Sequence, residues 1–257
     1  MTDQPLNATV IHREDPFEET AIVRVEPDGW DLPAFTPGQF ATLGLTDPEN
    51  PGDKLLKRVY SIASPPGLPY LEFYIRLVKA GNFTQRLWPC EVGDSIFLEP
   101  RIVGTFTLDP IPEGSNLILI STGTGLAPYV SMTQHFSGKG RWRHLAVIHG
   151  ARVVGELGYR QMLSEMSQAD EAMVYLPLVT REPEDSPWTG LRGRVQSIFE
   201  EGVFEDHAGF SLDPEQCQVM LCGNPDMIDE MEKRLKPLGF NRHTSSEPGN
   251  LHFERYW

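Results

Sequence analysis

Short segments with the hydrophobic pattern of β-strands fill the first 110 residues. Each is rich in β-branched or aromatic residues and is bounded by turn sequences such as Pro37-Gly38 and Pro65-Pro66-Gly67. The segments are 9–12, 20–25, 39–45, 58–63, 71–78 and 95–99, with one short helical candidate at 83–89. Six strands at hairpin spacing predict a small antiparallel β-barrel, and the pattern alone leaves a β-sandwich open.

The pattern changes after residue 110, where apolar runs lose the alternation of half-buried strands. The runs lie at 117–121, 145–149, 173–179 and 218–221. Such runs are typical of strands that are buried on both faces of a sheet. Helical candidates separate or follow them at 129–136, 159–166, 195–200 and 226–235. This alternation predicts a doubly wound parallel α/β sheet. We therefore expect two domains, 1–110 and 111–257, with their boundary near residues 109–115.

The last helical candidate has the clearest ends. Asn224 can cap its first turn, and Pro225 suits the first helical position. Met227, Met231 and Leu235 recur every four residues. This spacing predicts one buried face.

Charge and composition narrow the function classes. The chain has 257 residues, of which 40% are hydrophobic, with 22 Lys or Arg against 36 Asp or Glu, so the formal net charge is −14. Residues 1–110 carry 9 basic and 16 acidic side chains (−7), and the remainder carries 13 and 20 (−7). An evenly spread negative charge disfavours nucleic-acid or anionic-membrane binding as the main role. The start of the chain shows no export signal and no apolar run is long enough to span a membrane, so we expect a cytoplasmic protein.

Three cysteines give little support for metal or disulfide chemistry. Cys90, Cys217 and Cys222 are odd in number and lack C-x-x-C spacing. That argues against a disulfide framework, a zinc ribbon and a plant-type iron–sulfur cluster, and we expect no metal site.

Three segments carry candidate chemistry. Residues 121–128 form a Gly-rich turn between a buried strand and a helix, although Pro128 stands where the third Gly of a G-x-G-x-x-G motif would be. Backbone N–H groups at such a turn favour phosphate oxygens, and a plain tight turn is the alternative. Cys222-Gly223-Asn224-Pro225 also follows a strand, where ligands bind in open α/β sheets. In Arg58-Val59-Tyr60-Ser61, the guanidinium suits a phosphate and the phenol ring suits a planar heterocycle, although packing is a common role for a strand Tyr.

These motifs occur together in one family. R-x-Y-S at 58–61, Gly81-Asn82-Phe83-Thr84, G-T-G-x-x-P at 123–128, C-G-x-P at 222–225 and an aromatic C-terminus stand in this order. Over nearly its whole length the chain resembles the bacterial ferredoxin/flavodoxin–NADP⁺ reductases. The resemblance implies non-covalently bound FAD in the first domain and NADP(H) in the second.

The resemblance also implies roles for single residues. Arg58 and Thr84 would hold the FAD pyrophosphate, Tyr60 would stack on the flavin, and Ser61 would lie near flavin N5. The implied FAD residues are Arg58, Val59, Tyr60, Ser61, Tyr74, Ile75, Arg76, Leu77, Asn82, Phe83, Thr84, Thr124, Tyr256 and Trp257. The implied NADP residues are Gly123, Thr124, Gly125, Ala151, Arg152, Thr180, Arg181, Arg194, Gly223, Asn224 and Asp226. The implied catalytic residues are Ser61, Cys222, Glu254 and Tyr256.

Arginines at strand ends favour NADP over NAD. A 2′-phosphate calls for Arg, whereas an NAD ribose calls for a carboxylate. Arg152, Arg181 and Arg194 follow successive strands and match family positions, and the nearest acidic residue to the second strand is Glu156. Each Arg alone is typical of a solvated surface charge, but three at the ends of one sheet indicate a phosphate site.

The C-terminus predicts a gate. By resemblance Tyr256 would cover the flavin, Trp257 would stack on the FAD adenine, and Glu254 would relay a proton. An aromatic ring over the flavin has to move before nicotinamide can stack there. We expect deletion of Tyr256-Trp257 to alter NADP⁺ affinity and turnover, and unchanged kinetics would refute the gate.

The resulting hypothesis is an FAD-dependent enzyme that exchanges hydride with NADP(H) and single electrons with ferredoxin or flavodoxin. The partner would bind transiently to a monomer, at one of two groups of basic residues. One group is Lys54, Lys57, Arg76, Lys79 and Arg86, and the other is Lys139, Arg141 and Arg143. Two alternatives stay open, an NAD(P)H-dependent flavin reductase component of an oxygenase system and a nucleotide-binding redox sensor.

Overall fold

The computed structural model describes residues 6–47, 55–200 and 202–255. The chain divides into two compact units, Met1–Thr107 with Ala127–His135, and Leu108–Leu126 with Phe136–Trp257. No helix in the described ranges has the length and apolarity to cross a membrane. The expected boundary near residues 109–115 stays a prediction, because a helix that follows it in the sequence groups with the first unit.

The first unit contains the predicted antiparallel barrel. Its strands are β1 (Ala8–Phe17), β2 (Thr20–Pro27), β3 (Phe40–Leu45), β4 (Leu56–Ser61), β5 (Leu71–Arg76) and β6 (Ser95–Leu98). They pair antiparallel in the order β4-β3-β6-β1-β2-β5. An antiparallel bridge between Ile62 and Phe73 joins the two ends of this order. The sheet therefore closes on itself, which excludes the β-sandwich.

Two helices complete the first unit. Helix α1 (Asn82–Leu87) buries Phe83, Thr84 and Leu87, and Phe83 and Leu87 belong to the barrel core together with Leu43 and Phe73. Helix α2 (Ala127–Phe136) packs its ring of Tyr129 against Phe106, at 6.1 Å between centroids. Its Ser131 hydroxyl donates a 2.7 Å hydrogen bond to the Ser64 carbonyl oxygen.

The second unit is built on a parallel sheet, which confirms the predicted fold class. Its strands are β7 (Asn116–Thr122), β8 (His144–Ala151), β9 (Met173–Val179), β10 (Leu191–Arg192), β11 (Cys217–Gly223) and β12 (Leu251–Arg255). Their order is β10-β9-β8-β7-β11-β12, and each neighbouring pair is parallel. Strands 7, 8 and 11 are almost wholly buried, as continuous apolar runs predict.

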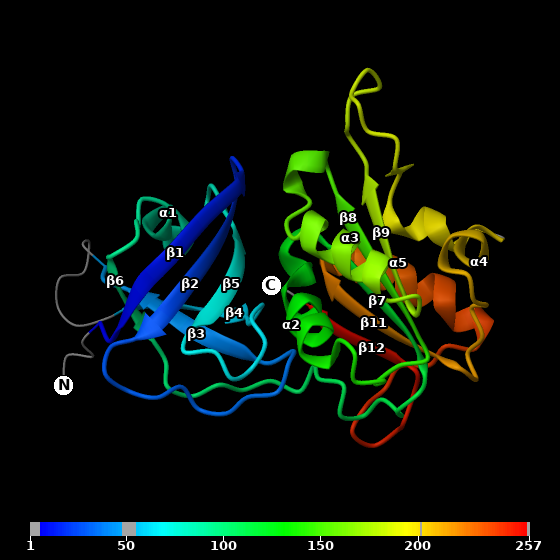
Figure 1. The fold of residues 1–257 in the computed structure, drawn as a ribbon, viewed down its shortest axis with the longest axis horizontal. Helices are drawn as coiled ribbons and strands as arrows, with labels where there is room; N and C mark the ends of the chain where they lie inside the picture. The colour runs from blue at the N-terminus through cyan, green and yellow to red at the C-terminus, as the bar shows by residue number, and fades with distance from the viewer. Residues whose placement is uncertain (1–5, 48–54, 201, 256–257) are drawn as a thin grey trace. The chain divides into compact units, whose positions relative to one another are not determined.

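Helices cover both faces of this sheet. Helix α5 (Pro225–Leu235) packs Met227, Met231 and Leu235 onto the face that carries Ile118 and Ile148. Helix α3 (Arg160–Ala169) lies on the other face, in front of the strands in Figure 1. The predicted cap is present, because the Asn224 side chain accepts hydrogen bonds from the amides of Asp226 and Met227.

The structure differs from the sequence pattern at several elements. The helix predicted at 195–200 is instead the 3-10 helix η3 (Val195–Phe199). Strand β10, helix α4 (Val203–Ala208) and strand β12 were not predicted, nor were the short 3-10 helices. Two residues in β10 and six in α4 are too few for a hydrophobic period to be recognised.

Candidate functional site

The carboxyl ends of the parallel strands bring most of the predicted nucleotide residues to one edge of the second unit. Thr122 pairs with Gly150, and Ala151 pairs with Val179, so β7, β8 and β9 end level with one another. The predicted residues that end these strands and β11, or that follow the strands of this sheet, are Gly123, Thr124, Gly125, Ala151, Arg152, Thr180, Arg181, Arg194, Gly223, Asn224 and Asp226. Ligands of open α/β sheets bind at this edge.

The Gly-rich turn packs closely against the end of β11. A Cβ on Gly125 would lie 2.5 Å from the Cys222 carbonyl oxygen. A Cβ on Gly223 would lie 2.6 Å from the Thr122 hydroxyl oxygen, and its φ of +129° already disfavours other residues. Both glycines are therefore required by backbone packing, before any ligand is considered.

The other side of the turn is open. A Cβ on Gly123 would meet no atom within 4 Å. The Thr124 side chain is half-buried, and its hydroxyl makes no hydrogen bond with the part of the chain that the structure describes. An available hydroxyl and backbone amides at the start of a helical segment fit the oxygens of a pyrophosphate.

A histidine that the sequence analysis did not single out lies beneath this turn. His149, in β8, is completely buried. Its Nε2 is 3.2 Å from the Gly123 carbonyl oxygen and its Nδ1 is 3.1 Å from the Tyr175 hydroxyl. Burial lowers the pKa of His149 to about 4. Its polar side chain at the end of the apolar run 145–149 was the feature of the sequence that could have indicated this residue.

The three predicted phosphate-binding arginines differ in their partners. Arg152 is held by Glu156, whose side chain is only 4% exposed and accepts a 2.7 Å hydrogen bond from Arg152 Nε. Arg181 is exposed, and its amide donates to the Arg152 carbonyl oxygen at 2.7 Å. Arg194 is exposed, and its nearest described carboxylate, in Glu230, is 3.9 Å away. The guanidinium groups of Arg181 and Arg194 thus stay accessible to a ligand.

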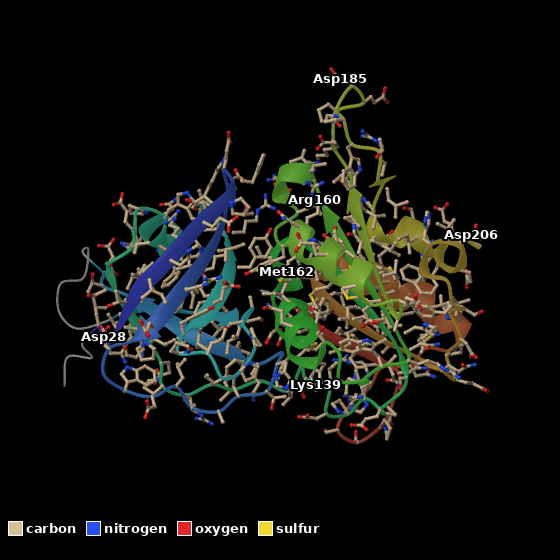
Figure 2. The ribbon with its side chains drawn as sticks, viewed as in Figure 1. Asp28, Lys139, Arg160, Met162, Asp185 and Asp206 are labelled. Atoms are coloured by element: carbon tan, nitrogen blue, oxygen red, sulfur yellow. The ribbon has the colours of Figure 1, made fainter. Side chains whose placement is uncertain are left out.

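Arg192, beside Arg194, has a structural role. Its guanidinium donates to the carbonyl oxygens of Glu182 and Pro183, at 2.6 and 3.0 Å. These residues begin the β9–β10 connection, which projects from the sheet, with Asp185 near its tip (Figure 2). Arg192 therefore braces this connection, whereas Arg181 and Arg194 do not.

Two predicted catalytic residues of the second unit, Cys222 and Glu254, lie side by side on adjacent strands. Cys222 in β11 pairs with Ser121 in β7 and with Glu254 in β12. Cys222 has an exposed fraction of 0%, whereas Glu254 is half-buried. The structure thus places the thiol and the carboxylate on adjacent strands at the ligand edge. Tyr256 and Trp257 lie outside the described residues.

Most of the predicted flavin residues lie in the barrel unit, on β4, β5, α1 and the loop between β5 and α1, whereas Thr124 lies in the second unit. Arg58 is exposed and Val59 is 59% exposed. The Tyr60 ring packs on Phe83, at 5.8 Å between centroids, and edge-on against Phe73 at 6.4 Å. Burial raises the pKa of the Tyr60 phenol far above its usual value. Ser61 is buried at the end of the strand. An exposed cation and apolar side chain beside a fixed aromatic ring fit a dinucleotide with a planar ring.

The connection from β5 to α1 is closed by Thr84. Its hydroxyl accepts from the Val78 amide at 3.0 Å and donates to the Val78 carbonyl oxygen at 3.2 Å. Gly81 precedes α1 without a side-chain cap, so the Thr84 hydroxyl shapes the loop while the amides of Asn82 and Phe83 begin the helix. Of the other predicted residues, Tyr74 and Ile75 are buried, Leu77 donates its amide to Glu19, and Arg76 forms an ion pair with Glu19.

Comparison with known proteins shows which family the chain belongs to. A family model described as the oxidoreductase NAD-binding domain matches residues 119–233. The flavodoxin/ferredoxin–NADP reductase of Escherichia coli (strain K12) is 33% identical over 225 residues, covering 87% of this chain and 88% of that protein. The ferredoxin–NADP reductase of Pseudomonas aeruginosa is 34% identical over 231 residues, covering 86% of each. The chain belongs to the ferredoxin/flavodoxin–NADP reductase family.

A solved structure supports the same fold for this reductase. A ferredoxin NADP⁺ reductase from Neisseria gonorrhoeae, whose crystal structure contains FAD and NADP, matches with a TM-score of 0.86. The match covers 97% of both chains at 23% identity. The resemblance drawn from the motifs and the fold class are both confirmed.

The two groups of basic residues in this reductase differ in pairing. In the barrel group, Lys57 pairs with Glu99, Arg86 pairs with Asp47, and Glu19 pairs with both Arg76 and Lys79; Lys54 lies outside the described residues. In the second group, Lys139, Arg141 and Arg143 form no ion pair with any residue that the structure describes. Three carboxylates thus compensate most of the positive charge of the four described residues in the barrel group. The second group has no such partner among the described residues.

Proposed function

We propose that this reductase is an FAD-dependent oxidoreductase that exchanges hydride between NADP(H) and flavin N5 and exchanges single electrons with ferredoxin or flavodoxin. The observation that carries the proposal is identity of 33–34% to named reductases over 86–87% of the chain. When bound, FAD supplies both the two-electron and the one-electron chemistry that such a reaction needs. We assign residues 1–110 to FAD and residues 111–257 to NADP.

The barrel residues would bind and orient the flavin cofactor. Arg58 offers a bidentate donor to a pyrophosphate oxygen pair. The Tyr60 ring, which Phe73 and Phe83 hold in place, offers a flat face for stacking. Ser61 places a hydroxyl at the end of the same strand, next to the position that we assign to flavin N5. These contacts would fix the reactive ring without a covalent bond.

The sheet residues would bind the pyridine nucleotide. The turn at Gly123, Thr124 and Gly125 offers amides and a hydroxyl to the nucleotide pyrophosphate. Arg181 and Arg194 would bind the 2′-phosphate directly, and Arg152, held by Glu156, would supply a third positive charge. Hydride transfer needs the two reacting atoms about 3–3.5 Å apart. Cys222 and Glu254 would position the nicotinamide and a proton at the strand ends.

The electron carrier would dock on the second basic group. Lys139 and Arg143 are exposed, and Arg141 is fixed by hydrogen bonds to the carbonyl oxygens of Leu108 and Ile111, both 2.6 Å. Electrostatic steering depends on the local field, so a net charge of −14 does not prevent docking of an acidic carrier there. We propose a transient complex with a monomeric reductase in the cytoplasm, operating mainly in the direction of NADPH oxidation.

The decisive experiment is an anaerobic titration of the purified protein. The protein should be yellow, and NADPH should bleach the flavin absorption band with one equivalent, far faster than NADH does. The reduced enzyme should then pass electrons singly to ferredoxin or flavodoxin. A colourless protein, or a flavin band that neither nucleotide bleaches, would contradict the proposal.

The same titration separates the alternatives. Equal bleaching by NADH and NADPH, with transfer to free flavin and none to either carrier protein, would favour the flavin reductase of an oxygenase system. Bound FAD that no nucleotide reduces would favour a redox sensor. Deletion of Tyr256-Trp257 tests the gate independently, through the KM for NADPH and the turnover number.

A further inference from the structure

His149 connects the core of the parallel sheet to the Gly-rich turn. It lies in β8 on the face opposite α5, as does Tyr175 in the adjacent strand β9. His149 Nε2 lies 3.2 Å from the Gly123 carbonyl oxygen, and its Nδ1 lies 3.1 Å from the Tyr175 hydroxyl. The ring is completely buried. Both of its nitrogens have hydrogen-bond partners within the second unit.

The chemistry of the partners fixes the direction of both hydrogen bonds. A carbonyl oxygen can only accept, so Nε2 must carry the hydrogen that points to Gly123. Burial lowers the pKa of His149 to about 4, so the ring is neutral at pH 7 and Nδ1 has no hydrogen. The Tyr175 hydroxyl therefore donates to Nδ1. The Gly123 carbonyl oxygen thus fixes the tautomer, and Tyr175 satisfies the nitrogen that this tautomer leaves as an acceptor.

The bond to Gly123 helps to set where the next amide points, together with the 3-10 helix η1 (Gly123–Leu126) that begins at this residue. The peptide bond between Gly123 and Thr124 is trans, so its C=O and N–H point in opposite directions. Because the oxygen points inward to His149, the Thr124 N–H points outward, to the open side of the turn. Gly123 has a φ of +55°, and the His149 bond adds a side-chain contact that holds this glycine peptide.

We propose that His149, oriented by Tyr175, is a positioning residue for the pyrophosphate of the pyridine nucleotide and acts through the Gly123–Thr124 peptide. The inference rests on the proposed function, because it takes the turn to be the pyrophosphate site. His149 holds the Thr124 amide ready before the nucleotide arrives, which lowers the ordering cost of binding. The residue touches neither the nucleotide nor the reacting atoms.

Four variants test this role. H149L removes the donor but keeps an apolar side chain of moderate size. H149Q keeps both an N–H donor and an oxygen acceptor. Y175F removes only the hydroxyl that pairs with Nδ1 of His149. The matched control is H144L, which changes a histidine of the same strand whose ring stacks on Phe210 at 5.2 Å, five residues before the turn contact.

Calorimetric titration should compare NADP⁺ with adenosine 2′-monophosphate, which lacks the pyrophosphate. We expect H149L to raise the Kd for NADP⁺ about tenfold, the effect of one misplaced hydrogen bond to a charged group. The Kd for adenosine 2′-monophosphate should stay within twofold. H149Q should recover most of the loss. Y175F should lose about threefold, because Nδ1 loses its partner while the Nε2 bond to Gly123 stays. H144L should match the wild type.

Two further measurements test the positioning role. The first does not depend on turnover, and the second separates KM from kcat. Hydrogen exchange of the ligand-free segment 121–127 should be faster in H149L than in H144L. In NADPH-driven turnover, H149L should raise KM about tenfold, following the weaker binding, and should leave kcat within twofold.

The outcomes separate this inference from the proposed function. Equal weakening of both ligands by H149L, or unchanged NADP⁺ affinity in H149L and Y175F, would overturn the positioning role and leave the reductase proposal intact. Failure of the wild-type protein to bind NADP⁺ would overturn the reductase proposal, and the inference with it. If H149L does not fold, the Y175F and H149Q affinities decide alone.

Discussion

The two units build their candidate sites in opposite ways. In the barrel, the contacts expected with the cofactor come from side chains that stand on the surface, such as Arg58 and Val59. In the parallel-sheet unit, they come from a backbone turn that Gly125, Gly223 and His149 hold in place from beneath. A side-chain site can be altered without touching the fold, whereas a backbone site shares its residues with the core.

The largest effect of a single substitution should come from Gly223→Ala in the sheet unit. The new Cβ would meet Thr122 atoms at 2.6 and 2.8 Å at a φ of +129°, so the turn has to move. We expect the free energy of unfolding to fall by about 3 kcal/mol, which is in the range for overpacked and strained sites. We also expect NADP⁺ binding to be lost. Urea unfolding and calorimetric titration measure the two losses.

Gly138→Ala is the matched control. Gly138 also has a positive φ, of +68°, but its Cβ would meet nothing within 4 Å. This variant should cost only about 1 kcal/mol, from backbone strain alone, and should bind NADP⁺ normally. Similar losses in both variants would show that close packing of the turn does not matter.

Acid should weaken the sheet unit through two buried histidines. Burial lowers the pKa of both His149 and His252 to about 4, and for His252 the neighbouring His243 lowers it further. Between pH 6.5 and 4 the unfolded chain binds protons that the folded one does not, so stability falls as pH falls through this window. At pH 5 each histidine should cost roughly 2 kcal/mol relative to pH 7.

Urea unfolding at pH 7 and pH 5 measures this loss. The groups that face the two rings are Tyr175 at His149, and Gln218 and His243 at His252. The double variant His149→Gln, His252→Gln should have a shallower pH dependence than the wild type. An equally steep dependence in the double variant would assign acid sensitivity to other groups.

Arg58→Ala tests the barrel side of the comparison. Because Arg58 is exposed and donates only to the Lys57 carbonyl oxygen among its described hydrogen bonds, its loss should change the free energy of unfolding by less than about 0.5 kcal/mol. FAD affinity should fall about 30-fold, the effect of a lost charge-assisted contact. Arg101→Ala, another exposed arginine of this unit, should leave FAD affinity unchanged. A folding defect in Arg58→Ala would show that this site also supports the core.

The smallest effect should come from the basic groups. Lys139→Glu with Arg143→Glu should slow association with ferredoxin or flavodoxin about fivefold at low salt, and high salt should remove the difference. Lys79→Glu is the control, because Lys79 is paired with Glu19 at 2.7 Å, and this carboxylate reduces its field. Stopped-flow association rates at two salt concentrations measure both. A larger effect at Lys79 would move the docking site to the barrel.

The sequence predicted best what local chemistry decides. The helix α5 follows directly from Asn224, Pro225 and a four-residue apolar period. The parallel strands follow from apolar runs that no alternation interrupts. The Gly-rich turn was found because strand, glycines and helix are contiguous in the chain.

Hydrogen bonds and ion pairs between residues far apart in the chain could not be predicted from the sequence pattern. His149 acquires its meaning from Gly123 and Tyr175, each 26 residues away along the chain. The compensation of Lys57 by Glu99 joins residues 42 apart. Only the Arg152–Glu156 pair, at i and i+4, could have been anticipated, since that spacing is a local signal. Strand β12 was missed because a short edge strand with charged residues resembles a loop.

The position of β12 has a practical consequence for making the protein. This strand is the outermost of its sheet, runs parallel to β11, and pairs Glu254 with Cys222. The chain therefore leaves the sheet at the edge where the Gly-rich turn begins. Truncation or fusion directly after Arg255 would therefore change the chain at the edge of the sheet that holds the Gly-rich turn.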